Sequence, residues 1–398
     1  MDPALEAFRG EARAWLDENF PPSLKGQGAL MMAEGPAPDD ADFRHWKQRM
    51  GDRGWGVPTW PAAYGGGGLT VAETRVLREE MARIGAWNPI GGMGVMMFGP
   101  TLLEYGTEEQ KQRHIPSIAN GTLRWCQGYS EPGSGSDLAS LQTKAEDIGE
   151  YFLVNGSKIW TSGAQYADWC FCLTRTDPTR KHEGISFLLI DMRTPGVETR
   201  PILLISGSSP FCETFFTDVK VPKENLVGPL NGGWTVGKRL LQHERSGISG
   251  ADGGRAQPTA RPLREAAKRY KGVDADGALA DSDMRARAAM LDMDQKAYAL
   301  TIARVAAETK NQNGPSAATS IMKNAYSRAA TDQAEMIVEA MGLNGLGWDG
   351  DDFTAEEWAA GRAYLRVKSS TIAGGSQEIQ NNIIAKRILG LPDTTQNR

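Results

Sequence analysis

Two short segments of the sequence combine residue types that could bind a planar polar ring. Residues 128–143 read GYSEPGSGSDLASLQT, and residues 156–163 read GSKIWTSG. The glycines of the first segment let backbone amides approach a ligand, and its serines offer short neutral hydrogen-bond donors. The tryptophan of the second segment offers a flat apolar wall, and the hydroxyls that follow can bond to the rim of a stacked ligand. Together the two segments favour a site for a heteroatom-edged ring system such as a flavin.

Each segment has a simpler interpretation when it is taken alone. The first is also typical of a solvated turn between strands, and the second is also typical of a core tryptophan in a β domain. The first segment is not a dinucleotide-binding GxGxxG motif, because no βαβ unit surrounds its glycines.

A carboxylate in the C-terminal third of the chain is placed where a catalytic base would be useful. A single helical stripe, at four-residue steps, joins Val236, Leu240, Glu244 and Ile248. A carboxylate among apolar side chains is unfavourable unless it is paired or its pKa rises, and a desolvated carboxylate is a better base. The alternative is a glutamate at the edge of the stripe that reaches solvent or pairs with a lysine.

Residues 371–392, TIAGGSQEIQNNIIAKRILGLP, contain a second candidate for binding a ligand. The sequence AGGSQ predicts a tight turn, and the spaced isoleucines that follow predict the start of a helix. Free backbone amides at such a helix entrance can hold a phosphate or a polarised carbonyl.

The elements that position these residues fall into three consecutive parts. Residues 1–122 have a helical pattern of apolar residues. Residues 123–230 contain β-rich runs such as ISFLLI and TFFTDVKV with no helical segment between them, which argues against a parallel Rossmann sheet. Residues 231–398 are helical again. We therefore expect a mainly helical protein with a central β domain.

Local signals predict several element boundaries. Thr107 and Gln110 have the spacing of a capping box, so a helix should begin near Glu108. The glycine-rich residues 60–70 predict a loop between two helices. One long amphipathic helix is predicted through Met284, Ala288, Leu291, Tyr298, Ile302 and Val305. Another is predicted through Ile321, Met322, Ala325 and Ala329.

Composition argues against several classes of partner and location. The chain has 398 residues, with 44 Lys and Arg against 49 Asp and Glu, which gives a formal net charge of −5. These charges are spread along the chain, so no nucleic-acid partner is expected. The N-terminal residues resemble no signal or transit peptide, and no apolar stretch is long enough to span a bilayer. We therefore expect a cytoplasmic protein without membrane insertion.

Metal and thiol chemistry are not expected. The four histidines lack metal-ligand spacing, and no HExxH, GxSxG or P-loop motif occurs. Cys170 and Cys172 flank Phe171, so on a strand the two thiols point to the same face. The pair lacks the spacing of a redox or metal motif, and we interpret the four cysteines as buried structural thiols.

Four segments, taken together, resemble the motifs of the acyl-CoA dehydrogenase family over essentially the whole chain. YSEPGSGSD resembles the family's (Ser/Thr)-Glu-Pro-Gly-x-Gly-Ser-Asp signature, and KIWTSG resembles its flavin-facing tryptophan motif. FFTDVKVPKENLVG resembles the strand and turn before the C-terminal bundle, and GGSQEIQNNIIAKRILG resembles the closing motif. The resemblance implies an N-terminal helical domain at 1–122, a β-barrel at 123–230 and a C-terminal four-helix bundle at 231–398.

The resemblance also implies FAD as cofactor and α,β-dehydrogenation of an acyl-CoA thioester to the 2,3-enoyl-CoA, with hydride transfer to flavin N5. It assigns FAD contacts to Gln127, Tyr129, Ser130, Trp160, Thr161, Ser162, Glu339, Gly342, Leu343, Ser376, Gln377 and Glu378. It assigns substrate contacts to Ser136, Gln242, Arg245, Ala373 and Gly374. The backbone amide of Ala373 would bond to the thioester oxygen and stabilise the enolate-like charge.

The sequence departs from the common family pattern in three places. Ala373 stands where many members carry the catalytic Glu, but a subset acting on branched or bulky acyl groups supplies it from the first long C-terminal helix. That subset has a Leu-x-x-Glu-Arg setting, which residues 241–245 match, so the resemblance implies Glu244 as the base. The Arg-x-x-Phe-Gly motif that reaches the FAD pyrophosphate is absent between residues 250 and 291. Glu339 replaces a Gln near the same diphosphate.

These departures resemble bacterial members that act on CoA thioesters of steroid side chains, in which two different chains share each FAD. We therefore expect a tetramer of this chain with itself or with a related chain, in which a non-identical partner supplies pyrophosphate contacts. The acceptor implied is electron-transferring flavoprotein. Two alternatives stay open: a flavin oxidase of the same fold, of acyl-CoA or nitroalkane type, and a non-catalytic subunit of a heterotetrameric acyl-CoA dehydrogenase.

Overall fold

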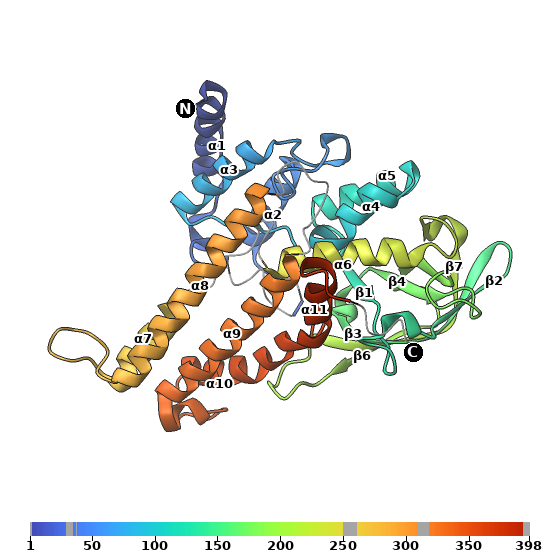
Figure 1. Ribbon diagram of the computed structural model, residues 1–398. Coiled ribbons are helices and arrows are strands. Elements are labelled where there is room, and N and C mark those ends of the chain that lie inside the picture. Colours follow the sequence, from blue (N-terminus) through green and yellow to red (C-terminus); the bar gives the residue numbers. More distant parts are fainter. Residues whose placement is uncertain (1, 29–34, 37, 250–260, 309–317, 393–398) are drawn as a thin grey trace. The chain divides into compact units, whose positions relative to one another are not determined.

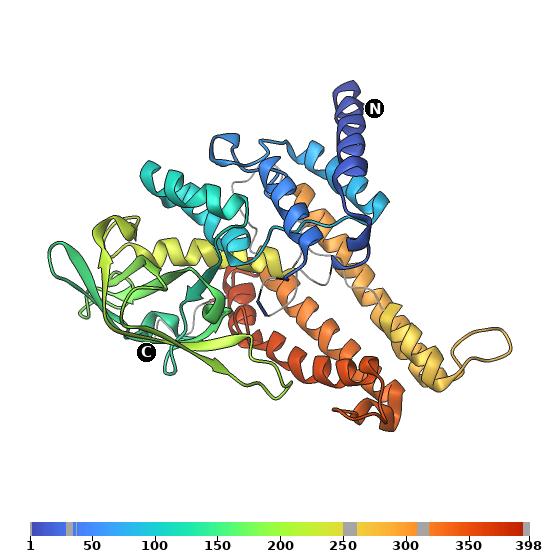
Figure 2. The same cartoon turned by 180° about the vertical axis from the view of Figure 1, so that it is seen from behind.

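The computed structural model describes residues 2–28, 35–36, 38–249, 261–308 and 318–392 (Figures 1 and 2). The chain divides into two compact units. Unit 1 comprises Met1–Ile202 and Ser209–Leu240, and unit 2 comprises Leu203–Ser208 and Leu241–Arg398. No helix in the described ranges is long and apolar enough to cross a membrane.

The N-terminal part of unit 1 is helical, and its first three helices contribute to a core cluster rich in aromatic residues. The helices are α1 (Pro3–Asn19), α2 (Ala41–Asp52), α3 (Val71–Ile84), α4 (Gly99–Tyr105) and α5 (Glu108–Ala119). The predicted start of α5 is confirmed, because Thr107 and Gln110 form a capping box there. The glycine-rich segment at residues 60–70 separates α2 from α3, as predicted.

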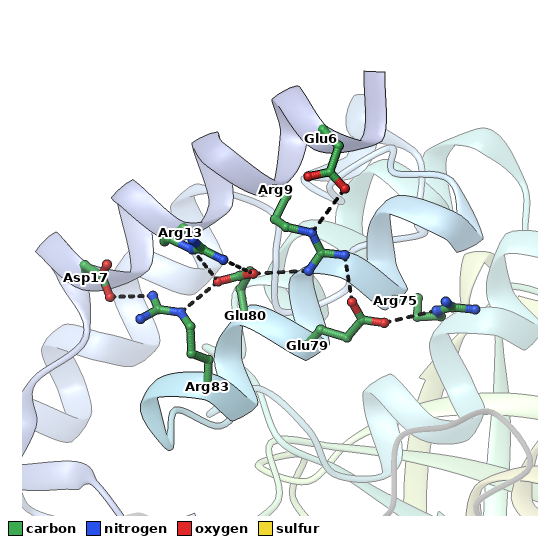
Figure 3. Close-up of polar contacts among 8 residues, drawn as sticks. All are labelled: Glu6, Arg9, Arg13, Asp17, Arg75, Glu79, Glu80 and Arg83. Carbon is green, nitrogen blue, oxygen red and sulfur yellow. Dashed lines mark hydrogen bonds and ion pairs between the residues drawn. The ribbon is translucent and has the colours of Figure 1, made fainter. Parts of the chain in front are cut away.

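A network of ion pairs joins α1 to α3 (Figure 3). The buried carboxylate of Glu80 accepts hydrogen bonds from Arg13, Arg83 and Arg9 over 2.8–3.1 Å. The bonds from Arg13 first, and then from Arg83 and Arg9, lower the pKa of Glu80 to about 2 although burial opposes them. Removing the partners of a buried charge destabilises a fold by about 3–5 kcal/mol, so this network fixes α1 on α3.

The β domain of unit 1 is an eight-stranded sheet with no α-helix between its strands in the described residues. The strands are β1 (Trp125–Gly128), β2 (Lys144–Asp147), β3 (Tyr151–Ser162), β4 (Trp169–Arg175), β5 (Ile185–Asp191), β6 (Val197–Ile202), β7 (Phe211–Pro222) and β8 (Leu226–Val227). Their order is β6-β7-β3-β2-β4-β5-β8, and β1 pairs in parallel with β4. The expected β domain, as opposed to a Rossmann sheet, is confirmed.

The cysteines are structural, as predicted. All four thiols are free and buried. Cys170 and Cys172 share one face of β4 and belong to the core cluster of the sheet. Phe171 points to the other face, where its ring stacks on Phe98 and Phe187.

Unit 2 is helical. Its helices are the second half of α6 (Gly233–Ser249), then α7 (Arg261–Lys271), α8 (Ser282–Glu308), α9 (Thr319–Met341), α10 (Ala355–Val367) and α11 (Gln377–Ile383). The predicted stripe of α8 is confirmed, since Met284, Leu291 and Tyr298 are among its buried residues. Helix α9 forms where predicted, and its expected apolar face is confirmed in part, because Met322 is buried and Ala329 packs against a core cluster. Ile321 is exposed, whereas Lys323 is buried.

Candidate functional site

The glycine-serine segment and the tryptophan segment are hydrogen-bonded to each other in unit 1. The amide of Ile159 donates to the carbonyl of Ser130 at 2.8 Å. The Nζ of Lys158 donates to the carbonyl of Tyr129 at 3.1 Å. The two segments therefore form one structure, as a shared ligand site requires.

A buried ion pair lies inside this structure. Nζ of Lys158 is 2.8 Å from Oε1 of Glu131, and both side chains are buried. The same carboxylate accepts hydrogen bonds from the amides of Gln142 at 2.6 Å and Thr143 at 2.8 Å. Burial acts to raise the pKa of Glu131, but the ammonium of Lys158 and these hydrogen bonds hold it below its ordinary value.

Sequence reasoning selected neither partner of this pair. The available signal was one acid and one base inside otherwise neutral ligand-type segments, SEPG and SKIW. Because a charge in such a segment needs a partner if the segment packs, Glu131 and Lys158 could have been paired from the sequence.

Trp160 stands on a β-bulge. The register of β3 against β7 shifts between Lys158 and Thr161. Trp160 has a left-handed backbone with φ 60°, its side chain is 52% exposed, and its ring meets Phe211 edge-on. A bulge re-aims a side chain, and a left-handed backbone at a bulky residue costs about 1–3 kcal/mol. The fold therefore keeps a strained conformation that presents the indole outward, as a flat ligand wall requires.

The other residues of unit 1 that were predicted to contact the flavin ring differ in the exposure of their side chains. Gln127, Ser130 and Ser162 are half-buried, so their side chains are accessible. Tyr129 is buried, and its ring packs edge-on against phenylalanines of β4 and β5. Only backbone atoms of Tyr129 can therefore line a ligand site.

Thr161 requires the same correction. Its side chain is fully buried, and its hydroxyl donates to the carbonyl of Cys212 at 2.7 Å and lies 2.6 Å from the hydroxyl of Thr214. Along β3, Trp160 is exposed and Ser162 is half-buried, whereas Thr161 between them faces the interior. Ser136, the predicted substrate contact of the first segment, is exposed.

The candidate base lies on α6. Val236 and Leu240 are buried, and Glu244, one turn further along the same stripe, is half-buried. Gln242 is also half-buried. The side chains of Arg245 and Ile248 lie outside the described part of the chain. A half-buried carboxylate that continues an apolar stripe can be partly desolvated and still receive a proton.

The closing segment of unit 2 folds as a turn followed by a helix. Gly374 and Gly375 have left-handed backbones, with φ 67° and 94°. The hydroxyl of Ser376 caps α11 by accepting the amide of Ile379 at 3.4 Å. Of the other predicted contacts, Gln377 is half-buried, whereas Glu378 is exposed.

The backbone amide that was predicted to bind the thioester oxygen is already hydrogen-bonded within the turn. The amide of Ala373 already donates to the carbonyl of Ser369 at 2.9 Å. In the described ranges, the amide of Gly374 donates to no protein acceptor. Gly374 can therefore bind a carbonyl oxygen without breaking a protein hydrogen bond, whereas Ala373 cannot.

The predicted diphosphate residues at the end of α9 do not suit an anion. Glu339 forms two 2.7 Å hydrogen bonds with Arg287, and these bonds lower the pKa of Glu339. The same guanidinium lies 3.5 Å from Asp283, so one cation faces two carboxylates. Leu343 is exposed, and Gly342 has a left-handed backbone. A diphosphate would meet excess negative charge here.

Comparison with known proteins covers almost the whole chain. Family models described as the N-terminal, middle and C-terminal domains of acyl-CoA dehydrogenase match residues 2–122, 126–219 and 231–389. The chain is 37% identical to acyl-CoA dehydrogenase IpdE1 of Mycobacterium tuberculosis, over 98% of both chains.

Two solved structures are similar over their full length. The structure described as the Tcur3481-Tcur3483 steroid ACAD has a TM-score of 0.77 at 30% identity and covers 99% of both chains. The ChsE4-ChsE5 complex from Mycobacterium tuberculosis has a TM-score of 0.73 at 30% identity, again over 99% of both chains.

Proposed function

The chain belongs to the acyl-CoA dehydrogenase family, and we propose that it dehydrogenates a bulky acyl-CoA thioester with Glu244 as the catalytic base. The observation that carries this proposal is the position of Glu244. It continues the buried stripe of Val236 and Leu240 with a half-buried carboxylate. Members of the family are oxidoreductases that generally depend on FAD.

The reaction removes a proton from the carbon next to the thioester and a hydride from the following carbon. The carboxylate of Glu244 takes the α-proton and becomes a neutral acid. The amide of Gly374 donates to the thioester oxygen, which stabilises the negative charge that develops as the proton leaves. FAD, when bound, supplies the acceptor for the hydride.

The outer face of β3 suits a flavin ring. The indole of Trp160 is presented outward by the bulge, and the hydroxyl of Ser162 lies on the same face. Ser130 is fixed next to this face by its hydrogen bond to Ile159. These residues would hold the ring, orient it and exclude water from one of its sides.

The residues predicted to contact the diphosphate of the cofactor suit it less well than the outer face of β3 suits the ring. The cluster of Arg287, Glu339 and Asp283 carries more negative than positive charge, so it does not suit a diphosphate. We propose that a related, non-identical chain supplies these contacts in a heterotetramer. The similarity to a structure described as the ChsE4-ChsE5 complex supports an assembly of two kinds of chain.

We further propose that the acyl group is branched, bulky or steroid-derived. Support comes from the similarity to a structure described as a steroid ACAD. Electron-transferring flavoprotein is the proposed acceptor, and the cytoplasm is the proposed location.

The test is flavin bleaching by a panel of CoA thioesters under anaerobic conditions. Glu244→Gln should keep its FAD and lose about 10²- to 10⁴-fold in bleaching rate, because general-base catalysis contributes that much. Glu146→Gln, at an exposed carboxylate of β2, is the matched control and should bleach at the wild-type rate. A Glu244→Gln variant that bleaches as fast as this control would rule out the assigned base.

A further inference from the structure

Two buried polar side chains reach the closing turn from beneath. Nζ of Lys323, on α9, donates to the carbonyl of Thr371 at 3.3 Å, and only 1% of this residue is exposed. Nε2 of Gln380, on α11, donates to the carbonyl of Gly374 at 2.8 Å, and this residue is fully buried. Between the two anchored carbonyls, Ile372 is 69% exposed. The turn is thus held from inside while its outer side stays accessible.

These anchors constrain the peptide plane that carries the Gly374 amide. A peptide unit is planar, so a hydrogen bond to its carbonyl also fixes the direction of its N–H. Lys323 fixes the peptide plane between Thr371 and Ile372 through its hydrogen bond to the carbonyl of Thr371. Gln380 fixes the peptide plane that contains the carbonyl of Gly374. The amide of Ala373, bonded to Ser369, fixes the plane between them. The remaining peptide plane, which contains the amide of Gly374, therefore lies between two planes that hydrogen bonds hold in place.

The fit of Gln380 depends on a glycine. A Cβ at Gly375 would lie 2.5 Å from Nε2 of Gln380, so the side-chain amide of Gln380 would have to shift. Gly375 also has φ 94°, a conformation that other residues rarely adopt. The backbone of the turn at Gly375 and the buried side-chain amide of Gln380 therefore fit each other in shape.

The polar layer under the turn is not explained by stability. Oε1 of Gln380 and Oγ of Ser370 are buried without a hydrogen-bond partner among the described residues. Burial lowers the pKa of Lys323, and the carboxylate of Glu378 only partly offsets this. Burying an ammonium and a partly unsatisfied amide is costly, so these polar groups point to a functional role as donors to the carbonyls of the turn.

We propose that Lys323 and Gln380 are positioning residues that hold the Gly374 amide in the orientation in which it binds the thioester oxygen. The inference rests on the proposed function, because it presumes a thioester at this amide. Neither side chain touches the substrate, since both are buried behind the turn.

The test uses the full chain with FAD and any partner chain that it requires, in Lys323→Met, Lys323→Arg and Gln380→Met variants. Lys296→Met, at an exposed lysine of α8, is the matched control. Hydrogen exchange of peptides covering residues 371–384 should be faster by about tenfold in Lys323→Met and Gln380→Met, and unchanged in the control.

Kinetics then separate positioning from mere structural support. An interaction used only in the transition state affects kcat and not KM, and removing a whole oxyanion donor costs about 10²- to 10³-fold in kcat. A loosened donor should therefore reduce kcat by about 10- to 100-fold, with KM within about twofold. Lys323→Arg keeps a donor and should recover most of the loss.

Every outcome decides a specific point. Unchanged hydrogen exchange in both Met variants would show that the two side chains do not hold the turn. Faster hydrogen exchange with unchanged kcat would show that holding the turn does not contribute to catalysis. If Lys323→Met does not fold, Gln380→Met carries both measurements. If none of the CoA thioesters bleaches the flavin of the wild-type protein, the proposed function fails. The hydrogen-exchange measurement still decides whether Lys323 and Gln380 hold the turn.

Discussion

The glycine-serine and tryptophan segments of unit 1 and the closing turn of unit 2 are built in different ways. In unit 1, the buried charges of Lys158 and Glu131 are paired, and the carboxylate also accepts two backbone amides. In the turn of unit 2, Oε1 of Gln380 is buried without a partner in the described residues, and the amide of Gly374 has no protein acceptor there.

We infer from this difference that the segments of unit 1 form a preformed wall, whereas the proposed ligand completes the turn of unit 2. Fully satisfied polar networks in a protein interior rigidify their surroundings. Unsatisfied buried groups are rare in native proteins and mark strain, bound water or a functional role. We therefore expect changes in unit 1 to act on stability, and changes around the turn to act on catalysis.

The largest effect is expected from breaking the ion pair between Lys158 and Glu131 in unit 1. Lys158→Met leaves the carboxylate of Glu131 buried without its cation, so the free energy of unfolding should fall by about 3–5 kcal/mol. Urea denaturation followed by tryptophan fluorescence measures the loss. Lys144→Met, at an exposed ion pair of β2, is the control and should change stability by less than about 1 kcal/mol. A similar small loss in Lys158→Met would mean that the wall does not depend on the pair.

Acid should weaken unit 1 through Glu80. Its pKa is about 2 in the folded state against 4.5 as the reference, so its stabilisation is fully present above pH 4.5. That stabilisation, about 3 kcal/mol, is lost as the pH falls through the folded pKa. Unfolding free energies of the wild type and Glu80→Gln between pH 7 and pH 2 should therefore converge at the acid end. A constant difference across this range would contradict the assigned pKa.

A smaller effect is expected at the turn. Gly375→Ala strains a backbone with φ 94° and places a Cβ 2.5 Å from Gln380, so kcat should fall about tenfold. Gly149→Ala is a matched control, because φ is 95° and no atom lies within 4 Å of the added Cβ. Both variants should lose about 1–3 kcal/mol of stability from backbone strain. Equal kcat in the two variants would remove the link between Gln380 and catalysis.

The smallest expected effect concerns the diphosphate end. Glu339→Gln removes one of the two carboxylates that face Arg287 and should strengthen FAD binding by about tenfold, or about 1.4 kcal/mol. Fluorescence titration of the apoprotein with FAD measures the change. Glu335→Gln, at an exposed ion pair of the same helix, is the control. Equal FAD affinity in the two variants would show that Glu339 does not oppose the cofactor.

The architecture could be predicted from the sequence because hydrophobic periodicity is a local property. The β-rich runs and the capping box at Thr107 each report on neighbouring residues, and β5, β7 and α5 form as expected. The residues alone could not decide between an exposed and a core Trp160, because its exposure depends on a register shift between β3 and β7, which are distant in sequence.

Two other features were missed for related reasons. Periodicity assigned Ile321 to the buried face of α9, but the face that packs carries Met322 and Lys323, and the ammonium of Lys323 donates to the carbonyl of Thr371. The choice between the amides of Ala373 and Gly374 depends on backbone hydrogen bonds that side-chain patterns do not encode. Tertiary contacts, rather than local propensity, decide these positions.

The central claim is that Glu244 takes the α-proton, and exchange of that proton with solvent tests it most directly. The FAD-loaded protein is incubated with a CoA thioester in D₂O without an electron acceptor, and deuterium at the α-carbon is followed by NMR. The wild type and Glu146→Gln should incorporate deuterium, whereas Glu244→Gln should be slower by about 10²- to 10⁴-fold. Incorporation by Glu244→Gln at the wild-type rate would contradict the account.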